Sequence, residues 1–222
     1  MEDGVEATLR RLAELIAGSP HNLVSRGDRA DVFGIHVQEC RGYTAALELE
    51  AGQRWIDVGT GGGLPGLVLA AMAPDVHWTL VDSVAKKTEA VRGFAETLGL
   101  PNVTVLTGRA EDLAHDAAFR EQFNGAISRA VAPLPSLVEY LAGFVQPNGL
   151  VVGVKGPRWE DELAAARPAL QLLRLAEWRV VPIPDAARPS WLVMMRRQGT
   201  LRELYPRRAG LPKSQPLGGT PA

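Results

Sequence analysis

The chain has 222 residues, of which 46% are hydrophobic and 22% are charged, and these proportions are typical of a globular protein with a sizeable core. Its formal net charge of −1 at pH 7 argues against a general nucleic-acid-binding protein. The single cysteine, Cys40, excludes an internal disulfide and a multi-thiolate metal site, so we expect a reducing, cytoplasmic environment and no metal centre.

The first segment of the chain predicts helices. Residues 1–18 are acidic and amphipathic rather than basic and then apolar, so no signal peptide is expected. Apolar residues at helical spacing predict a helix over Val5–Ala17, and a second helix is expected from Asp31 to about Leu49. We therefore expect a helical extension over residues 1–50. No apolar run approaches the roughly 20 residues that cross a bilayer, so no membrane partner is expected.

From residue 51 onward, short apolar strands alternate with helix-length segments. The strands lack polar alternation, which is typical of a sheet buried on both faces. The alternation predicts an α/β fold, in which a parallel sheet carries helices on both faces. The candidate strands are residues 54–58, 77–81, 102–106, 123–128, 150–155, 178–183 and 190–195, with helices at 65–72, 84–98 and 134–145.

The last two strands break this rhythm. Only residues 184–189 separate them, too few for the dozen or more residues of a parallel crossover, so we expect an antiparallel hairpin. Five parallel strands followed by a hairpin resemble the Rossmann-like, seven-stranded and mostly parallel sheet of class I methyltransferases that use S-adenosyl-L-methionine (AdoMet). The predicted methyltransferase domain covers residues 51–213, and residues 214–222 are expected to form a disordered tail.

The stretch WIDVGTGGGLPG at residues 55–66 places a glycine-rich loop directly after the first strand. Glycines there let the backbone approach a ligand and adopt positive φ, which makes Gly59, Gly61 and Gly63 candidate cofactor-binding residues. The loop also satisfies the G-x-G-x-x-G pattern of dinucleotide-binding proteins, so NAD remains an alternative to AdoMet. Pro65 lacks the N–H that would bind a pyrophosphate, which favours AdoMet because it has no phosphate.

Acidic residues follow the next two strands. Asp82 ends the second strand, where a carboxylate accepts hydrogen bonds from both ribose hydroxyls of NAD or AdoMet alike. Glu111 lies in GRAED, residues 108–112, after the third strand, where a backbone amide and this carboxylate are expected to read the adenine edge. The alternative for Glu111 is a solvated acid favoured by the dipole at a helix start. Its place after the glycine loop and Asp82 favours ligand contact.

The fourth strand ends in ISRAVAPLP, and ligands of open α/β sheets bind beyond the carboxyl ends of the strands. We therefore expect Ser128 and Arg129 to point toward the transferred methyl group. No histidine, glutamate or cysteine is evident as a base or nucleophile, so a substrate atom with a free lone pair, such as N7 of guanine, would suit the site. Arg129 would orient the guanine or hold the cofactor carboxylate, with a surface salt bridge as the alternative.

Other basic residues are candidates for contact with phosphate. Lys155 ends the fifth strand, and its position there is equally consistent with binding a phosphate and with a structural role. Six basic residues lie from Arg196 to Lys213 against a single acid, Glu203. Such a run neutralises phosphates or forms a solvated terminal face. His36 is expected to pack between helices rather than to act in catalysis.

Together, these segments resemble the RsmG family, also called glucose-inhibited division protein B. The matching segments are NLVS at 22–25, H-x-x-E at 36–39, DVGTGGGLPG at 57–66, VDS-x-x-KK at 81–87, GRAEDL at 108–113, SRAVAPLP at 128–135, VKG at 154–156 and YPRRAGLPK at 205–213. They span nearly all of residues 20–217, and the combination of SRA-x-APL with YPRR-x-G-x-PK is specific. The resemblance implies methyl transfer from AdoMet to N7 of a guanine in bacterial 16S ribosomal RNA.

The resemblance also implies which residues form the site. It implies AdoMet contacts at Gly59, Leu64, Ala110, Glu111 and Arg129. It implies RNA contacts at Arg26, at Lys155 and along the segment that contains Arg207, Arg208 and Lys213.

Two positions depart from the family pattern. This chain has Ser19-Pro20-His21 where the family usually shows a tryptophan before the NL segment, and Glu39-Cys40 where the family usually shows Asp-Ser. We expect both positions to lie away from the cofactor loop, so that they bear on RNA docking and leave methyl transfer intact.

The leading hypothesis is a monomeric guanine-N7 methyltransferase that acts on 16S rRNA, within a small ribosomal subunit or an assembly intermediate. A small-molecule methyltransferase is disfavoured by the basic C-terminal segment. An NAD enzyme is disfavoured by the terminal hairpin and by the lack of a second substrate domain. A non-enzymatic ribosome-assembly factor with a retained AdoMet pocket is the remaining alternative.

Overall fold

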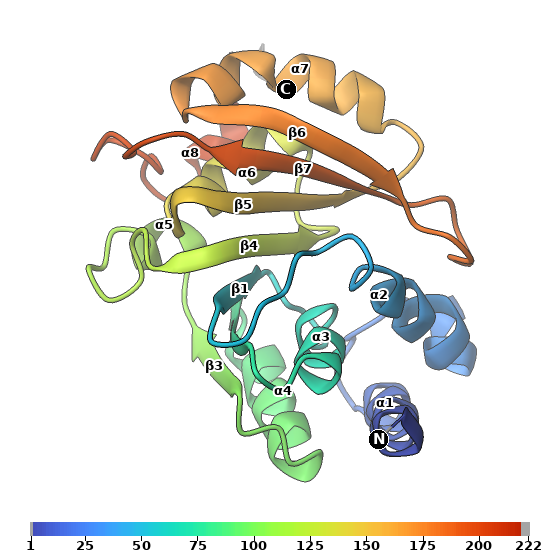
Figure 1. Cartoon of the computed structure of the whole chain (residues 1–222). Helices are drawn as coiled ribbons and strands as arrows, with labels where there is room; N and C mark the ends of the chain where they lie inside the picture. The colour runs from blue at the N-terminus through green and yellow to red at the C-terminus, as the bar shows by residue number, and fades with distance from the viewer. Residues whose placement is uncertain (1, 219–222) are drawn as a thin grey trace.

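Seven apolar segments form one sheet, in the order β3-β2-β1-β4-β5-β7-β6 (Figure 1). The computed structural model describes residues 2–218 and confirms the predicted α/β fold with its mostly parallel sheet. The strands are β1 (Arg54–Val58), β2 (His77–Asp82), β3 (Val103–Thr107), β4 (Phe123–Arg129), β5 (Val145–Lys155), β6 (Leu175–Pro182) and β7 (Trp191–Arg197).

The predicted hairpin at the end of the chain consists of β6 and β7. The two strands pair antiparallel, with Val180 opposite Val193. The other edge of β7 pairs antiparallel with β5, with Val152 opposite Met194, so β7 lies between β5 and β6. Among the seven strands in the described part of the chain, β7 alone runs against the others.

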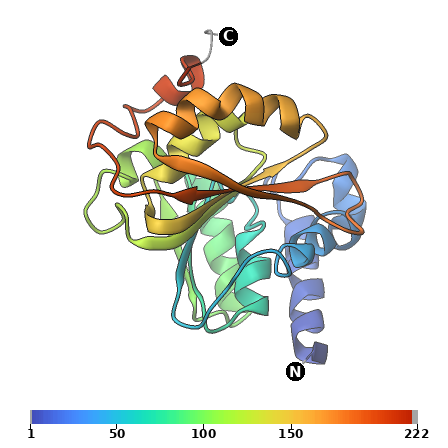
Figure 2. The same ribbon diagram turned by 45° about the horizontal axis from the view of Figure 1, so that its top comes forward.

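Each face of the sheet buries its own apolar core, because alternate residues of a strand point to opposite faces. Trp55 and Leu80 belong to one core and Ile56 and Val81 to the other. Helices cover both faces (Figure 2). The first core is covered by α1 (Glu2–Gly18), α2 (Gln38–Gly42), α3 (Gly66–Met72) and α4 (Ala85–Thr97), and the second by α5 (Ala110–Leu113), α6 (Leu134–Ala142), α7 (Trp159–Leu172) and α8 (Leu211–Ser214).

The first predicted helix is α1, whose apolar stripe packs against α3. Leu9, Leu12 and Ile16 on this stripe are completely buried. Within residues 2–218, no helix is both long and apolar enough to cross a membrane.

The second predicted helix, from Asp31 to about Leu49, is wrong in length and regularity. The segment consists of a 3₁₀ turn at Gly27–Asp31, a π-helical turn at Phe33–Val37 and the short α2, which ends at Gly42. Glycine and β-branched residues favour a regular helix weakly, and a carboxylate oxygen of Asp31 accepts a hydrogen bond from the Gly34 N–H at 2.7 Å. The break sets the direction in which the side chains of this segment point.

The end of the chain packs on the second core. Ser214 ends α8, and Leu217 is buried. Ser214 and Leu217 fall within the tail that was expected to be disordered, residues 214–222, yet the structure gives them these positions. The last part of that expected tail, residues 219–222, lies outside the described residues.

Gly125 of β4 allows a test of this packing, because it lies opposite Trp55 in the sheet. A Cβ at position 125 would lie 2.4 Å from the Trp55 ring, which is itself buried. We expect Gly125→Ala to lower the free energy of unfolding by about 1–3 kcal/mol through overpacking. Urea unfolding followed by circular dichroism measures the change.

Gly93 in α4 provides the matched control, because a Cβ there meets nothing within 4 Å. Gly93→Ala is expected to raise the free energy of unfolding by about 0.5–1 kcal/mol, since alanine favours a helix interior. Equal effects of the two substitutions would contradict the packing described for Gly125.

Candidate active site

Two adjoining cavities open where the strand order of the sheet reverses, between β1 and β4. In open α/β sheets, ligands bind at this switch point beyond the carboxyl ends of the strands. The larger cavity has a volume of about 690 Å³ and the smaller about 340 Å³. The residues that line both are Gly59, Lys87, Ala130 and Val131, so the two cavities adjoin beyond the ends of β1 and β4.

The glycine-rich loop forms the floor of the larger cavity. Gly59, Gly61 and Gly63 have φ values of 76°, 57° and 88°, a region that residues with a Cβ rarely adopt. A Cβ at Gly59 would lie 2.2 Å from the Val131 side chain, so only glycine lets the loop approach Val131 this closely. Gly59, Gly61 and Leu64 line the larger cavity, whereas a Cβ at Gly63 would meet Leu67 of α3.

Asp57 at the end of β1 anchors this loop. Its Oδ2 accepts hydrogen bonds from Thr60 Oγ1 at 2.7 Å and from the Gly66 N–H at 3.0 Å. The side chain is completely buried, and its Oδ1 has no hydrogen-bond partner among the described residues. Burial raises the pKa of Asp57 to about 6, although the hydrogen bonds from Thr60 and Gly66 oppose the shift.

Asp82 at the end of β2 lines the smaller cavity. Its two oxygens accept hydrogen bonds from the backbone N–H groups of Gly61 at 3.0 Å and Val84 at 2.9 Å. Since each carboxylate oxygen accepts two hydrogen bonds, both retain the capacity to bind the hydroxyls of a ribose.

Glu111 also lines the smaller cavity, and the alternative of a solvated acid is wrong, because only 1% of this residue is exposed. Its Oε1 accepts hydrogen bonds from Arg109 Nη2 at 2.7 Å and from the Gly210 N–H at 2.9 Å. Burial would raise the pKa of Glu111, but these hydrogen bonds outweigh it and lower the pKa. Ala110 and Lys213 line the same cavity, so the C-terminal segment helps to enclose it.

At the end of β4, the structure separates two residues that were expected to act together. Ser128 was expected to point toward the methyl group, but this expectation is wrong: it is completely buried and donates a hydrogen bond to the Val58 carbonyl at 2.6 Å. Adjacent residues of a strand point to opposite faces, which turns Ser128 away when Arg129 faces the larger cavity. Ala130, which follows, has a φ of 58°.

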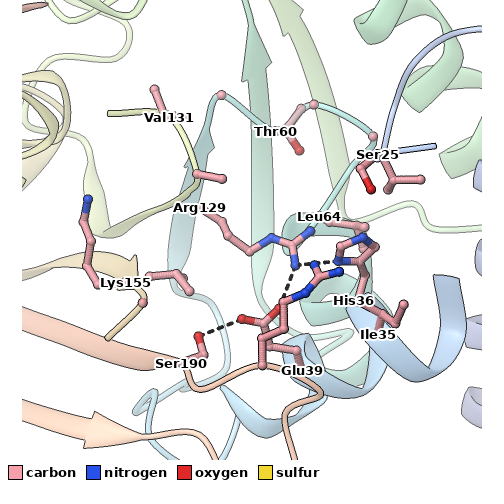
Figure 3. A pocket seen from close by; sticks show the side chains of 18 of the residues that line it. Ser25, Ile35, His36, Glu39, Thr60, Leu64, Arg129, Val131, Lys155 and Ser190 are labelled. Carbon is pink, nitrogen blue, oxygen red and sulfur yellow. Dashed lines mark hydrogen bonds and ion pairs between the residues drawn. The ribbon is translucent and has the colours of Figure 1, made fainter. Parts of the chain in front are cut away.

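Arg129 is held in the larger cavity through one nitrogen. Its Nη1 donates hydrogen bonds to Glu39 Oε2 at 2.9 Å and to His36 Nδ1 at 3.3 Å, and Ser190 Oγ donates to Glu39 Oε1 at 2.7 Å (Figure 3). Among the described residues, no hydrogen-bond partner is found for Nε or Nη2 of Arg129. These two groups remain able to bind a ligand oxygen.

His36 and Glu39 correct two sequence-based expectations. His36 was expected to pack between helices, and Glu39 to lie away from the cofactor loop, but both line the larger cavity together with Gly61. His36 lies in the π-helical turn and Glu39 in α2, and residues three apart on a helix share one face. The H-x-x-E spacing is visible in the sequence, but no local pattern indicates that this helix face meets the larger cavity.

His36 carries its proton on Nε2 in this arrangement. Arginine only donates hydrogen bonds, so His36 Nδ1 must accept the one from Arg129. Nε2 lies 3.2 Å from Asp28 Oδ2, and Arg188 donates two hydrogen bonds to the Asp28 carboxylate. Burial and then the charge of Arg129 lower the pKa of His36, so the imidazole is neutral at pH 7.

Two of the basic residues expected to contact RNA have partners inside the protein. Lys155 is 8% exposed, and its Nζ lies 2.8 Å from Glu162 Oε2 and donates to the Ala132 carbonyl; burial lowers its pKa. Arg207 forms a bidentate pair with the completely buried Glu139. In contrast, three of the expected RNA contacts are exposed, and these are Arg26, Arg208 and Lys213.

The side chains at the site do not suggest a metal. Within residues 2–218, no group of three or more His, Cys, Asp or Glu residues is placed to hold a metal ion.

Comparison with known proteins identifies the family. A family model described as rRNA small subunit methyltransferase G (GidB) matches residues 6–189. The chain belongs to this family. It is 35% identical over 199 residues to ribosomal RNA small subunit methyltransferase G of Moorella thermoacetica, covering 88% of this chain and 82% of that protein. The corresponding protein of Symbiobacterium thermophilum is 34% identical, with coverage of 96% and 90%.

Solved structures agree on the fold alone. The antibiotic-resistance methyltransferase Kmr gives a TM-score of 0.53 at 19% identity, covering 71% of this chain and 93% of that chain. The cyclase SpnF gives a TM-score of 0.57 at 13% identity, with coverage of 73% and 81%. These similarities confirm the class I methyltransferase fold, and family membership decides for AdoMet over NAD.

The cavities fit AdoMet. The two cavities adjoin at Gly59, and Asp82 and Glu111 line the smaller cavity, where donors of a ribose and an adenine would find carboxylate acceptors. Free N–H groups of Arg129 lie in the larger cavity. Pro65, without an N–H, precedes α3, so the loop is not built to bind a pyrophosphate.

The raised pKa of Asp57 predicts a pH dependence of stability. The folded protein binds the Asp57 proton more tightly than the unfolded chain, whose carboxyl has a pKa near 4, so stability falls as pH rises from about 4 to about 6. We expect this residue to reduce the free energy of unfolding by about 3 kcal/mol over that window. Urea unfolding of the wild type and of Asp57→Asn, repeated from pH 4 to 8, measures the difference.

Asp57→Asn has no titrating group at this position, so the difference in the free energy of unfolding between wild type and variant should change with pH. If this difference in the free energy of unfolding stays constant across pH 4–8, Asp57 does not titrate in this range.

Proposed function

We propose that the protein methylates N7 of a guanine in bacterial 16S rRNA, within a small ribosomal subunit or an assembly intermediate. It acts as a monomer in the cytoplasm, where that substrate is found. The observation that carries the proposal is the pair of joined cavities at the β1/β4 switch point, in a chain of the rRNA small subunit methyltransferase G family. Residues 51–213 form the methyltransferase domain, to which the extension at residues 1–50 contributes His36 and Glu39.

The smaller cavity would hold the adenosine part of AdoMet. Asp82 accepts the ribose hydroxyls, and Glu111 with the backbone of Ala110 contacts the adenine. Gly61 and Leu64, which line the larger cavity, would hold the methionine part. When bound, AdoMet supplies an electrophilic methyl group on a positively charged sulfur.

The chain's own residues bind and orient the acceptor base. N7 of guanine has a lone pair and no proton, so no side chain needs to act as a base. Nε and Nη2 of Arg129 provide N–H groups for an acceptor oxygen, either O6 of guanine or the cofactor carboxylate. The imidazole of His36 accepts a hydrogen bond from Arg129 and is therefore not free to accept a proton from a substrate.

The exposed basic residues contact RNA phosphates in this proposal. Arg208 and Lys213 lie on the C-terminal segment, and Arg26 follows Ser25 at the rim of the larger cavity. Lys155 and Arg207 support the site from inside, because each is paired with a carboxylate.

Methyl transfer tests the proposal directly. Labelled AdoMet is incubated with small-subunit particles and with stripped 16S rRNA, and the modified nucleotide is mapped. We expect label at a guanine N7, and a loss of at least about 100-fold in kcat/KM for Arg129→Ala, as for other groups that orient charge at a reacting centre. AdoMet binding without label on either substrate would contradict the proposed activity.

The basic segment is tested by the salt dependence of RNA binding. Neutralising Arg208 and Lys213 together should weaken binding and reduce the slope of log K against log salt concentration by about 2, because each cation neutralises one phosphate. Arg207 is left in place, since its removal would leave the buried Glu139 unpaired.

The control variant for this experiment neutralises Arg10 and Arg11 on α1, far from α8 (Figure 1). The same slope in the control and the test variant would remove the role assigned to this segment.

A further inference from the structure

The larger cavity must accept a cation although cationic side chains, Arg129 among them, already line it. AdoMet carries a positive sulfonium next to the methyl group, and the guanidinium of Arg129 lies in the cavity that would hold its methionine part. Arginine is always protonated in proteins. Two positive charges in a site with restricted access to water repel one another more strongly than they do in solution.

The carboxylate of Glu39 lies against this guanidinium. Glu39 Oε2 is 2.9 Å from Arg129 Nη1, and only 15% of each side chain is exposed, so water screens the pair weakly. Glu39 Oε1 accepts a hydrogen bond from Ser190 Oγ at 2.7 Å, which orients the carboxylate from the loop between β6 and β7 (Figure 3).

The neighbouring charges are balanced in the same way. Asp28 pairs with Arg188, whose Nη2 lies 2.5 Å from its Oδ1, and His36 between the two ion pairs is neutral at pH 7. The group made of Asp28, Arg188, His36, Arg129 and Glu39 therefore has a net charge of zero. Within it, Glu39 is the only acid in contact with the guanidinium of Arg129 among the described residues.

We propose, resting on the function proposed above, that Glu39 is a charge-balancing residue that allows the larger cavity to accept the sulfonium of AdoMet in the presence of Arg129. Glu39 neither touches the methyl group nor moves a proton. It lowers the positive potential where the sulfonium lies, and it thereby sets the preference of the site for AdoMet over the product S-adenosyl-L-homocysteine, whose sulfur is neutral.

The ratio of the two affinities provides the test, because both ligands share the adenosine, carboxylate and amino groups and differ in the charge on sulfur. Isothermal titration calorimetry with the full chain and no RNA gives both dissociation constants. Glu39→Gln should weaken AdoMet binding relative to S-adenosyl-L-homocysteine by about tenfold, which corresponds to about 1.4 kcal/mol. Glu39→Asp, which keeps the charge, should restore most of the wild-type ratio.

Two control variants separate charge from structure. Glu14→Gln on the exposed side of α1 makes the same change in net charge away from the cavity, and Ser190→Ala removes the hydrogen bond to Glu39 but keeps the carboxylate. Both should leave the affinity ratio within about twofold of the wild type. Thermal unfolding of each variant shows whether it is folded.

The outcomes distinguish this inference from the proposed function. If the wild type binds both ligands and Glu39→Gln weakens both equally, Glu39 has a structural role only and the inference is overturned. If Ser190→Ala changes the ratio as much as Glu39→Gln, the polar network rather than the charge is responsible, and the inference also fails. If the wild type binds neither ligand, the proposed function fails first. If the ratio shifts but no RNA is methylated, charge balance is supported and the assigned RNA substrate is wrong.

Discussion

The carboxylate of Asp57, buried at the end of β1, is the interaction on which the cofactor site depends. It binds the hydroxyl of Thr60 within the glycine loop and the first N–H of α3 at Gly66, so it holds both ends of the turn. A buried carboxylate with one unpaired oxygen costs free energy, as the raised pKa of Asp57 shows. The loop keeps its shape because this cost is offset by hydrogen bonds that no apolar side chain would supply.

The larger cavity is closed by charges that come from three distant parts of the chain. Asp28 and Arg188, 160 residues apart, form an ion pair that joins the N-terminal extension to the loop after β6. Glu39 joins the same extension to Arg129 at the end of β4, 90 residues away. Residues of this N-terminal segment therefore line the same cavity as the glycine loop and Arg129. The charges of Asp28, Arg188, Glu39 and Arg129 are arranged as two ion pairs, so these four residues together carry no net charge.

One basic residue of the C-terminal segment, Arg207, pairs with a buried carboxylate inside the protein. Arg207 forms an ion pair with the buried Glu139 on α6, and the N–H of Gly210 donates a hydrogen bond to Glu111 at the smaller cavity. A substitution in this segment can therefore alter the cofactor cavity as well as any RNA contact. Arg208 and Lys213 remain exposed among the basic residues that were expected to bind RNA here, although Lys213 also lines the smaller cavity.

The sequence by itself determined the fold, because strand and helix periodicity, the glycine loop and the short connection before β7 are local features. It also indicated Asp82 and Arg129, which lie at strand ends where ligands of such sheets bind. The tertiary structure alone decided which charges are free and which are paired. Glu39 on α2 lines the larger cavity and pairs with Arg129, and Arg207 pairs with the buried Glu139. Ion pairs between residues far apart in the chain depend on packing distances, and no local pattern encodes them.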